Sequence, residues 1–158
     1  MDRDIHIRRA TLADAQAITA LVNLAFRVER FFVEGDRIDV ERVGGLIEKG
    51  VFLLAEDTDG LAGCVHLELR GERGYFGLLA VEPSRQRCGW GGRLAREAED
   101  YARASGCRVM DIQTVNVRTE LPHIYRKMGY VQTGTAPFPA EVRSKLPCHF
   151  IVMSKPLV

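Results

Sequence analysis

The chain has 158 residues, of which 46% are apolar and 27% are charged, and its formal net charge is +1. This length and composition are ordinary for a globular protein, so we expect a single domain over residues 1–158. The balanced charge argues against binding of nucleic acid through bulk charge, and no apolar run approaches the ~20 residues of a membrane span. We therefore expect no nucleic-acid and no membrane partner, and the sequence leaves a homodimer open.

The cysteines give no sign of a metal site or a disulfide framework. They lie far apart, without a C-x-x-C pair and without a neighbouring histidine cluster, at Cys64, Cys88, Cys107 and Cys148. The first nine residues carry no apolar segment of the kind that a secretory signal needs. We interpret the cysteines as reduced thiols and expect a cytoplasmic protein that binds no metal.

The first third of the chain predicts a strand and two helices. Apolar and polar residues alternate over residues 5–10, which indicates a short strand. Thr11 is a suitable N-cap for a helix whose apolar residues recur at helical spacing to about Val28. Asp39 is expected to cap a second helix, and Gly50 to end it.

The rest of the chain alternates strands and helices. A turn at Asp59-Gly60 joins two strands, a glycine-led helix runs to about Ser105, and a short helix covers residues 120–128. The order predicts an α/β fold with one mixed, mainly antiparallel sheet of about seven strands and about four flanking helices. The expected strands in this part are residues 51–57, 61–70, 74–83, 109–115, 130–134 and 148–155.

The stretch "SRQRCGWGGRL", residues 84–94, places three glycines at the start of a helix, where glycine is unfavourable. Glycines let an anion approach the free N–H groups of a first helical turn closely. The stretch lacks the G-x-x-x-x-G-K-[ST] and G-x-G-x-x-G patterns and fits [QR]-x-x-G-x-[GA], at Gln86, Gly89 and Gly91. The alternative is a tight turn without a ligand, for which one glycine would suffice.

This pattern resembles the acetyl-CoA pyrophosphate loop of the GNAT superfamily of N-acetyltransferases. The segment "NVRTELPHIYRKMGYV" resembles a second feature of the family, at Asn116, Tyr125, Gly129 and Tyr130, and the closing "CHFIVMSKPL" resembles the final strand of many members. The resemblance covers nearly the whole chain. It implies a GNAT fold, acetyl-CoA as cosubstrate and no metal.

The resemblance also implies roles for individual residues. In the family, the strand before the loop splays from its neighbour and leaves N–H groups free for the thioester and the pantetheine arm. The tyrosine of the second motif protonates the departing CoA thiolate, which makes Tyr125 the expected catalytic acid. The implied cofactor-binding residues are Leu79, Ala80, Val81, Gln86, Arg87, Cys88, Gly89, Trp90, Gly91, Gly92, Asn116 and Tyr125.

Tyr125 and Asn116 are each also compatible with a purely structural role. Leu121, Ile124, Tyr125 and Met128 follow core spacing on a helix, so Tyr125 is also compatible with a packing role. Asn116 is also compatible with the simple start of a turn. The reaction needs a base that takes a proton from the substrate amine, and His66 and Glu68, which share one strand face, are candidates. The alternative is that both residues simply lie on a solvent-exposed face of the strand and have no role in the reaction.

In the family, the first two helices and their connection wall the acceptor pocket, so the resemblance implies an acceptor site near this connection. Two aromatic residues and two acidic residues there suit a cationic amine, or else a hydrophobic anchor beside a solvated turn. The candidate substrate residues are Phe31, Phe32, Glu34, Asp36 and Glu68. The predicted function is transfer of an acetyl group to a primary amine of a small molecule, amino acid, peptide or protein; the alternative is a non-catalytic acyl-CoA sensor with the same fold.

Overall fold

One mixed sheet of seven strands organises the residues that the computed structural model describes, 5–86 and 89–158. The strands lie in the order β1-β2-β3-β4-β5-β7-β6, and every neighbouring pair is antiparallel except β4 and β5. They are β1 (His6–Arg9), β2 (Val51–Asp57), β3 (Gly60–Arg70), β4 (Arg73–Val81), β5 (Val109–Val115), β6 (Val131–Pro137) and β7 (His149–Pro156).

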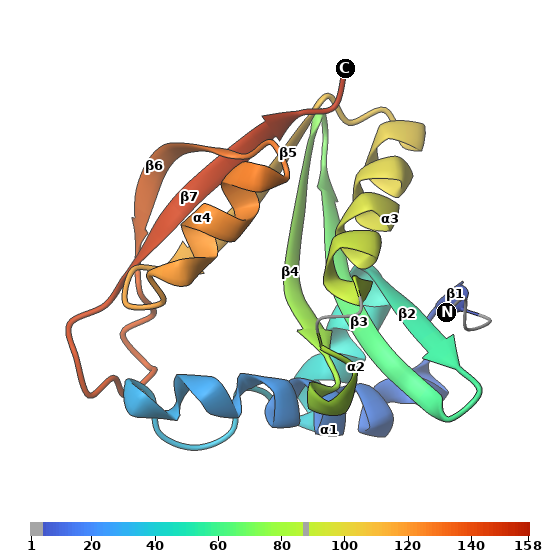
Figure 1. Ribbon diagram of the computed structural model, residues 1–158, viewed down its shortest axis with the longest axis horizontal. Coiled ribbons are helices and arrows are strands. Elements are labelled where there is room, and N and C mark those ends of the chain that lie inside the picture. Colours follow the sequence, from blue (N-terminus) through green and yellow to red (C-terminus); the bar gives the residue numbers. More distant parts are fainter. Residues whose placement is uncertain (1–4, 87–88) are drawn as a thin grey trace.

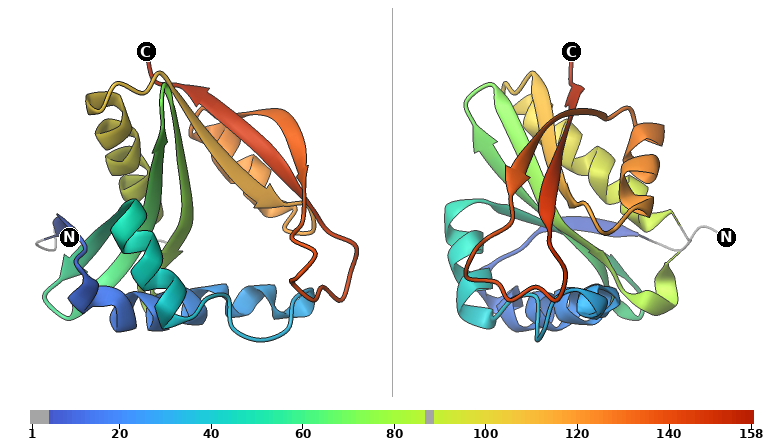
Figure 2. Two further views of the ribbon diagram at one scale, coloured as in Figure 1. Left: turned by 180° about the vertical axis from the view of Figure 1, so that it is seen from behind. Right: turned by 90° about the vertical axis from the view of Figure 1, so that its left-hand side faces the viewer.

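Across the same described residues, four α-helices cover the two faces of the sheet (Figures 1 and 2). Helices α1 and α2 lie on one face, and α3 and α4 lie on the other. The helices are α1 (Ala15–Ala25), α2 (Val40–Lys49), α3 (Trp90–Ala104) and α4 (Glu120–Lys127), and the 3-10 helices are η1 (Leu12–Asp14), η2 (Phe26–Phe31) and η3 (Pro83–Arg85). The predicted fold class is confirmed.

The two predicted capping residues both precede helical segments, although Thr11 caps the 3-10 helix η1 and α1 begins after it, at Ala15. The Asp14 carboxylate accepts a hydrogen bond from the Thr11 backbone N–H (2.8 Å) and pairs with the Arg8 guanidinium (2.7 Å). This guanidinium holds the pKa of Asp14 down at about 2. Helix α2 begins where the Asp39 carboxylate accepts the backbone N–H of Arg42 (2.8 Å).

The first helix differs from its predicted course. The sequence predicts an α-helix to about Val28, whereas the α form ends three residues earlier and the chain continues as η2. A 3-10 helix has three residues per turn, so Phe26, Glu29 and Phe32 project from one side of it. The connection between β6 and β7 packs against this segment, because the backbone N–H of Lys145 donates to the Phe32 carbonyl (2.6 Å).

Helix α3 lies very close to the sheet at Gly63. A Cβ atom added to Gly63 would approach Leu94 Cδ1 to 2.8 Å and the Ala80 carbonyl oxygen to 3.0 Å. The same helix carries Glu99, which is only 4% exposed. Its carboxylate accepts hydrogen bonds from the Tyr130 hydroxyl (2.7 Å) and the Lys155 ammonium (3.0 Å), and these bonds tie α3 to the C-terminal half of the sheet.

Strands β4 and β5 separate soon after they meet, as Figure 1 shows between the green and amber strands. Their ladder has three pairs, from Arg73↔Val109 to Tyr75↔Asp111, although β4 runs on to Val81. The register between β3 and β4 also shifts within Cys64–His66. The far part of β4 therefore lines an opening in the middle of the sheet.

Candidate active site

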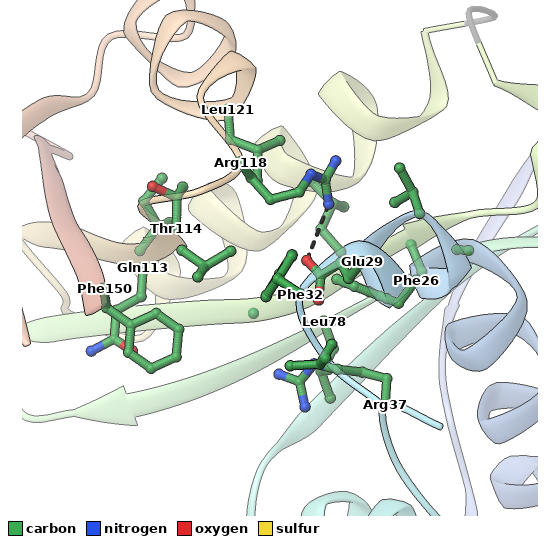
Figure 3. A pocket seen from close by; sticks show the side chains of 18 of the residues that line it. Phe26, Glu29, Phe32, Arg37, Leu78, Gln113, Thr114, Arg118, Leu121 and Phe150 are labelled. Carbon is green, nitrogen blue, oxygen red and sulfur yellow. Dashed lines mark hydrogen bonds and ion pairs between the residues drawn. The ribbon is translucent and has the colours of Figure 1, made fainter. Parts of the chain in front are cut away.

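A cavity of about 580 Å³ occupies the opening between the separated strands. Its walls come from residues 75–81 of β4 and residues 112–115 of β5, and η2 and α4 complete the lining (Figure 3). The connection between β6 and β7 contributes Phe138, Pro139 and Val142. A mostly apolar cleft with a few polar side chains is the usual form of a small-molecule site.

The β4 wall has an unusual backbone conformation at Leu78. Its φ is +49°, which makes it the one non-glycine residue with positive φ in the described part of the chain. Leucine is strained in this conformation by roughly 1–2 kcal/mol. The bulge turns the backbone where β4 has lost its β5 partner, so polar backbone groups on that edge face the cavity rather than a neighbouring strand.

The glycine-rich turn follows β4 directly. Gly89 has φ +81° and precedes α3, and a Cβ atom placed on it would meet nothing within 4 Å. The Gln86 side chain folds back and donates to the Val81 carbonyl (3.2 Å), which fixes the beginning of the turn. The predicted ligand residues Arg87 and Cys88 lie outside the described residues.

Three other residues of the predicted loop site have distinct surroundings. Trp90, the first residue of α3, is 5% exposed and packs into the core between α3 and the sheet, and it is not part of the cavity lining. A Cβ atom on Gly91 would face Val81 at 3.9 Å, and one on Gly92 would face the Arg96 side chain at 3.4 Å. Whatever the loop binds would meet the backbone of these residues.

Tyr125 of α4 lines the cavity. Its ring packs edge-on against Tyr130 (5.9 Å between ring centres) and lies 6.2 Å from Phe76 of β4. Burial raises the pKa of the Tyr125 hydroxyl to about 12, so the group stays protonated at neutral pH. Among the described residues, no group forms a hydrogen bond with this hydroxyl.

Asn116 lies at the end of β5 but is not part of the cavity wall. The side-chain oxygen of Asn116 accepts a hydrogen bond from the backbone N–H of His149 (2.8 Å), and the backbone N–H of Asn116 donates to the His149 carbonyl (2.9 Å). These two bonds hold the turn after β5 against β7. The remaining predicted cofactor residues, Leu79, Ala80, Val81 and Gln86, do line the cavity.

The structure brings only part of the predicted acceptor site to the cavity. Phe32 and Asp36 line it, whereas Phe31 and Glu34 are exposed outside its lining. Asp36 itself forms a surface ion pair with Arg30 (3.7 Å). Glu68 pairs with its strand neighbour (Glu68 Oε2–Arg70 Nη2, 2.6 Å) and is also outside the lining.

His66 does not lie on an exposed strand face. It is 3% exposed, and its ring packs against Phe52 on the α1–α2 side of the sheet (4.8 Å between ring centres). Burial lowers the pKa of its imidazole. The interpretation of an exposed face bearing both His66 and Glu68 is therefore wrong for His66, and this histidine is also absent from the cavity lining.

A buried ion pair in the cavity was not predicted from the sequence. Glu29 of η2 is 8% exposed, and its Oε2 lies 3.1 Å from Nη1 of Arg118, in the turn between β5 and α4 (Figure 3). Burial raises the pKa of the Glu29 carboxyl, and Arg118 offsets part of this effect. The sequence carries no signal for this pair, because Glu29 is a charged residue in a predicted helix and its partner Arg118 is distant in sequence.

Two further features of the described residues concern metal ions and membrane spans. No three His, Cys, Asp or Glu side chains gather there into a group that could hold a metal ion. No helix in residues 5–86 and 89–158 is long and apolar enough to cross a membrane. Cys64, Cys107 and Cys148 are free thiols, and Cys88 lies outside the described residues.

The two sides of the cavity offer different chemical groups. The bulged edge of β4 offers backbone groups to an extended polar chain, and the glycine-rich turn at its end suits an anion. Tyr125 offers a protonated hydroxyl from the α4 side. The η2 side supplies aromatic rings and the Glu29–Arg118 pair.

Comparison with known proteins identifies a matching family and a relative in sequence. The sequence profile of the acetyltransferase (GNAT) domain matches residues 48–132. The uncharacterized N-acetyltransferase YhfO of Bacillus subtilis is 27% identical over 154 residues, which cover 89% of this chain and all of the relative.

Solved structures show the same fold. The Salmonella typhimurium protein yncA, solved with its cofactor acetyl-CoA, superposes with a TM-score of 0.76 at 21% identity and covers 98% of this chain and 94% of its own. The ribosomal-protein-S18-alanine N-acetyltransferase of Escherichia coli superposes with a TM-score of 0.77 at 13% identity, over 97% of this chain and 94% of its own.

Proposed function

Because the chain belongs to the GNAT acetyltransferase family, we propose that it transfers the acetyl group of acetyl-CoA to a primary amine by direct attack of the amine on the thioester. The separation of β4 from β5 carries this proposal, since it gives an extended acyl-CoA arm both a cavity and an unpaired strand edge. Acetyl-CoA would supply an activated acetyl group, so the protein need only position it, stabilise charge and move protons.

The β4 bulge would bind the thioester. Leu79 and Val81 lie beyond the last β4–β5 pair, where backbone N–H groups can donate to the pantetheine amides and to the thioester oxygen. Such preorganised donors stabilise the negative charge that develops on that oxygen as the amine attacks. The strained conformation of Leu78 is consistent with this role, because backbone strain gathers at functional sites.

The turn at the N-terminus of α3 would bind the pyrophosphate. The positive φ of Gly89 turns the backbone there, and the space beside it is open. The first N–H groups of α3 and the positive end of its dipole then face the anion. The β4 edge and this turn are consecutive in the chain, so one extended ligand can use both.

Tyr125 would act on the leaving sulfur. Its hydroxyl is protonated, has no hydrogen-bond partner in the described part of the chain, and lies on the cavity wall across from β4. It can donate a hydrogen bond to the thiolate as the C–S bond breaks. This role agrees with the resemblance noted in the sequence, and it uses a hydroxyl that packing alone does not require.

The test is a pair of measurements on the intact chain. Calorimetry with acetyl-CoA measures binding, and release of the CoA thiol is followed with a panel of primary amines. We expect binding and amine-dependent thiol release. Tight binding with no release beyond slow hydrolysis for any amine would favour the non-catalytic acyl-CoA sensor, and absence of binding would exclude both functions.

A further inference from the structure

The η2 side of the cavity contains charged groups that the described chain leaves only partly paired. Glu29 is bonded through Oε2 alone, and its Oε1 accepts no hydrogen bond from the described residues. Arg118 uses Nη1 for Glu29 and Nε for Glu120 (3.4 Å), and its Nη2 has no partner there. One carboxylate oxygen and one guanidinium nitrogen thus remain available side by side.

A second guanidinium lies on the same side. Arg37 lines the cavity, and its guanidinium lies over the Phe26 ring, 5.7 Å from the ring centre. It has no ion pair with any described residue. In Figure 3 Glu29 and Arg118 meet in the centre of the view, and Arg37 lies below them. The wall therefore presents two basic groups, Arg37 and Arg118, and two acidic groups, Glu29 and Asp36. Of the two acidic groups, Asp36 is paired at the surface with Arg30.

These charges discriminate among amines. A purely cationic amine would find Glu29 matched by Arg118 and Asp36 matched by Arg30. The Arg37 guanidinium has no ion pair among the described residues, so its repulsion opposes the binding of such an amine. A molecule with an ammonium and a carboxylate a few bonds apart satisfies both signs. Guanidinium groups bind carboxylates strongly, because two N–H donors can match two oxygens.

The remaining walls of this side are apolar. Phe26, Phe32, Phe138 and Phe150 all line the cavity, as does Val142. Phe32 is 1% exposed and is held by the backbone bond from Lys145, so the wall is fixed rather than loose. An acceptor that pairs with the charges would therefore place an apolar or aromatic side chain against these rings.

We propose that the acceptor is a free amino acid with an apolar side chain, whose ammonium is held by Glu29 and whose carboxylate is held by Arg118 and Arg37. The ammonium gives one proton to the Glu29 carboxylate, and the neutral amine then forms an N–C bond to the acetyl carbon. The C–S bond breaks, and the departing CoA thiolate takes up the second N–H proton. This inference rests on the proposed acetyl transfer and names its substrate class. It differs from the sequence expectation of a cationic amine attracted by Glu34 and Asp36, since Glu34 lies outside the cavity and Asp36 pairs with Arg30.

The experiment compares acceptors that differ in one charged group. L-Phenylalanine and L-leucine carry the carboxylate, L-phenylalaninamide and phenethylamine lack it, and spermidine is a purely cationic amine. Steady-state release of CoA gives kcat/KM for each. We expect the amino acids to exceed phenylalaninamide and phenethylamine by about 10- to 100-fold, the size of a charge-assisted hydrogen bond.

Two variants test which protein residue binds the carboxylate of the acceptor and which binds its ammonium. Arg37→Gln should lower kcat/KM for phenylalanine about tenfold or more relative to phenylalaninamide, because only phenylalanine has a carboxylate to lose. Glu29→Gln should lower kcat/KM for both, because both carry the ammonium. Arg37 has no ion pair in the described chain, so its replacement should leave the fold intact. Arg118→Gln is a poorer test, because it would leave the buried Glu29 carboxylate without its partner and the variant would be less stable.

Matched controls are Arg27→Gln on η2 and Glu41→Gln on α2, which are exposed and outside the cavity lining. Neither should change the ratio between phenylalanine and phenylalaninamide. Equal or better turnover of phenethylamine or spermidine would overturn the inference while leaving acetyl transfer standing. Acetyl-CoA binding without turnover of any amino acid would overturn it as well, whereas loss of acetyl-CoA binding would strike the proposed function itself.

Discussion

Replacement of Tyr125 by phenylalanine tests the proposed acid with little disturbance of the fold. The ring contacts with Phe76 and Tyr130 are kept, and no hydrogen bond to the described residues is lost. The free energy of unfolding should therefore change by less than about 0.5 kcal/mol. Acetyl-CoA affinity should also change little, because the hydroxyl acts mainly when the C–S bond breaks.

The pKa of Tyr125 sets the size of the effect on turnover. Complete proton transfer from a hydroxyl whose pKa is about 12 to a thiolate whose pKa is ~8.5 is uphill by about 5 kcal/mol. Tyr125 therefore contributes mainly a hydrogen bond to the developing thiolate, which is worth about 1.5–3 kcal/mol. We expect turnover to fall roughly 100-fold, at the low end of the ~10²–10⁴ range for general acid catalysis.

The assay is single-turnover formation of CoA, so that product release does not hide the chemical step. Tyr101→Phe is the control, because Tyr101 is a half-buried tyrosine of α3 outside the cavity lining. The wild-type rate should also show no alkaline decline from Tyr125 deprotonation below about pH 11, because the pKa of this hydroxyl is about 12. A Tyr125→Phe enzyme that forms CoA at the wild-type rate would refute the reasoning and leave the residue a packing role.

Three further predictions follow from named contacts. Gly89→Val should weaken acetyl-CoA binding at least tenfold in calorimetry. Gly106→Val should not, although Gly106 also has a positive φ and follows the other end of α3. Glu99→Ala should lower the free energy of unfolding by about 3 kcal/mol, because it strands Lys155 and the Tyr130 hydroxyl, whereas Asp100→Ala should cost at most about 0.5 kcal/mol in the same denaturation experiment. Asp14→Asn should lower the free energy of unfolding by about 1 kcal/mol at pH 7, a value that allows for the partial exposure of Arg8. Because the pKa of Asp14 is depressed in the folded protein, the difference between wild type and variant is complete above about pH 4 and fades as the pH falls through about 2, which urea titrations can measure.

Most of the fold could be predicted because its signals are local. Asp39 caps α2 as expected, and β5 has the predicted bounds, because an N-cap and a period of two residues depend on neighbours in the chain. The 3-10 form of η2 could not be predicted in this way. It differs little in dihedral angles from an α-helix, and it is accompanied by a contact with Lys145, more than a hundred residues away in sequence.

The same distinction divides the site. The glycine-rich turn and Tyr125 belong to continuous sequence motifs, so the sequence indicated both and the structure places Tyr125 on the cavity wall. Glu29 belongs to no motif, and in the sequence it resembles any solvated helical charge. Its place in the cavity depends on the ion pair with Arg118, because only the tertiary structure brings Arg118 Nη1 within 3.1 Å of Glu29 Oε2.

Leu78 shows why the centre of the site is the hardest part to infer from residues alone. Leucine is a poor choice for positive φ, so nothing in its identity predicts a bulge, and the neighbouring Gly77 only permits one nearby. The conformation persists because the strand is anchored before and after it: β4 pairs with β3 at Gly77 and again from Ala80, while Leu78 packs against the α1–α2 core and Leu79 against the α3 core. The two cores thus hold the strained backbone that the proposed thioester site requires, which makes substrate binding depend on helices that do not themselves touch the thioester.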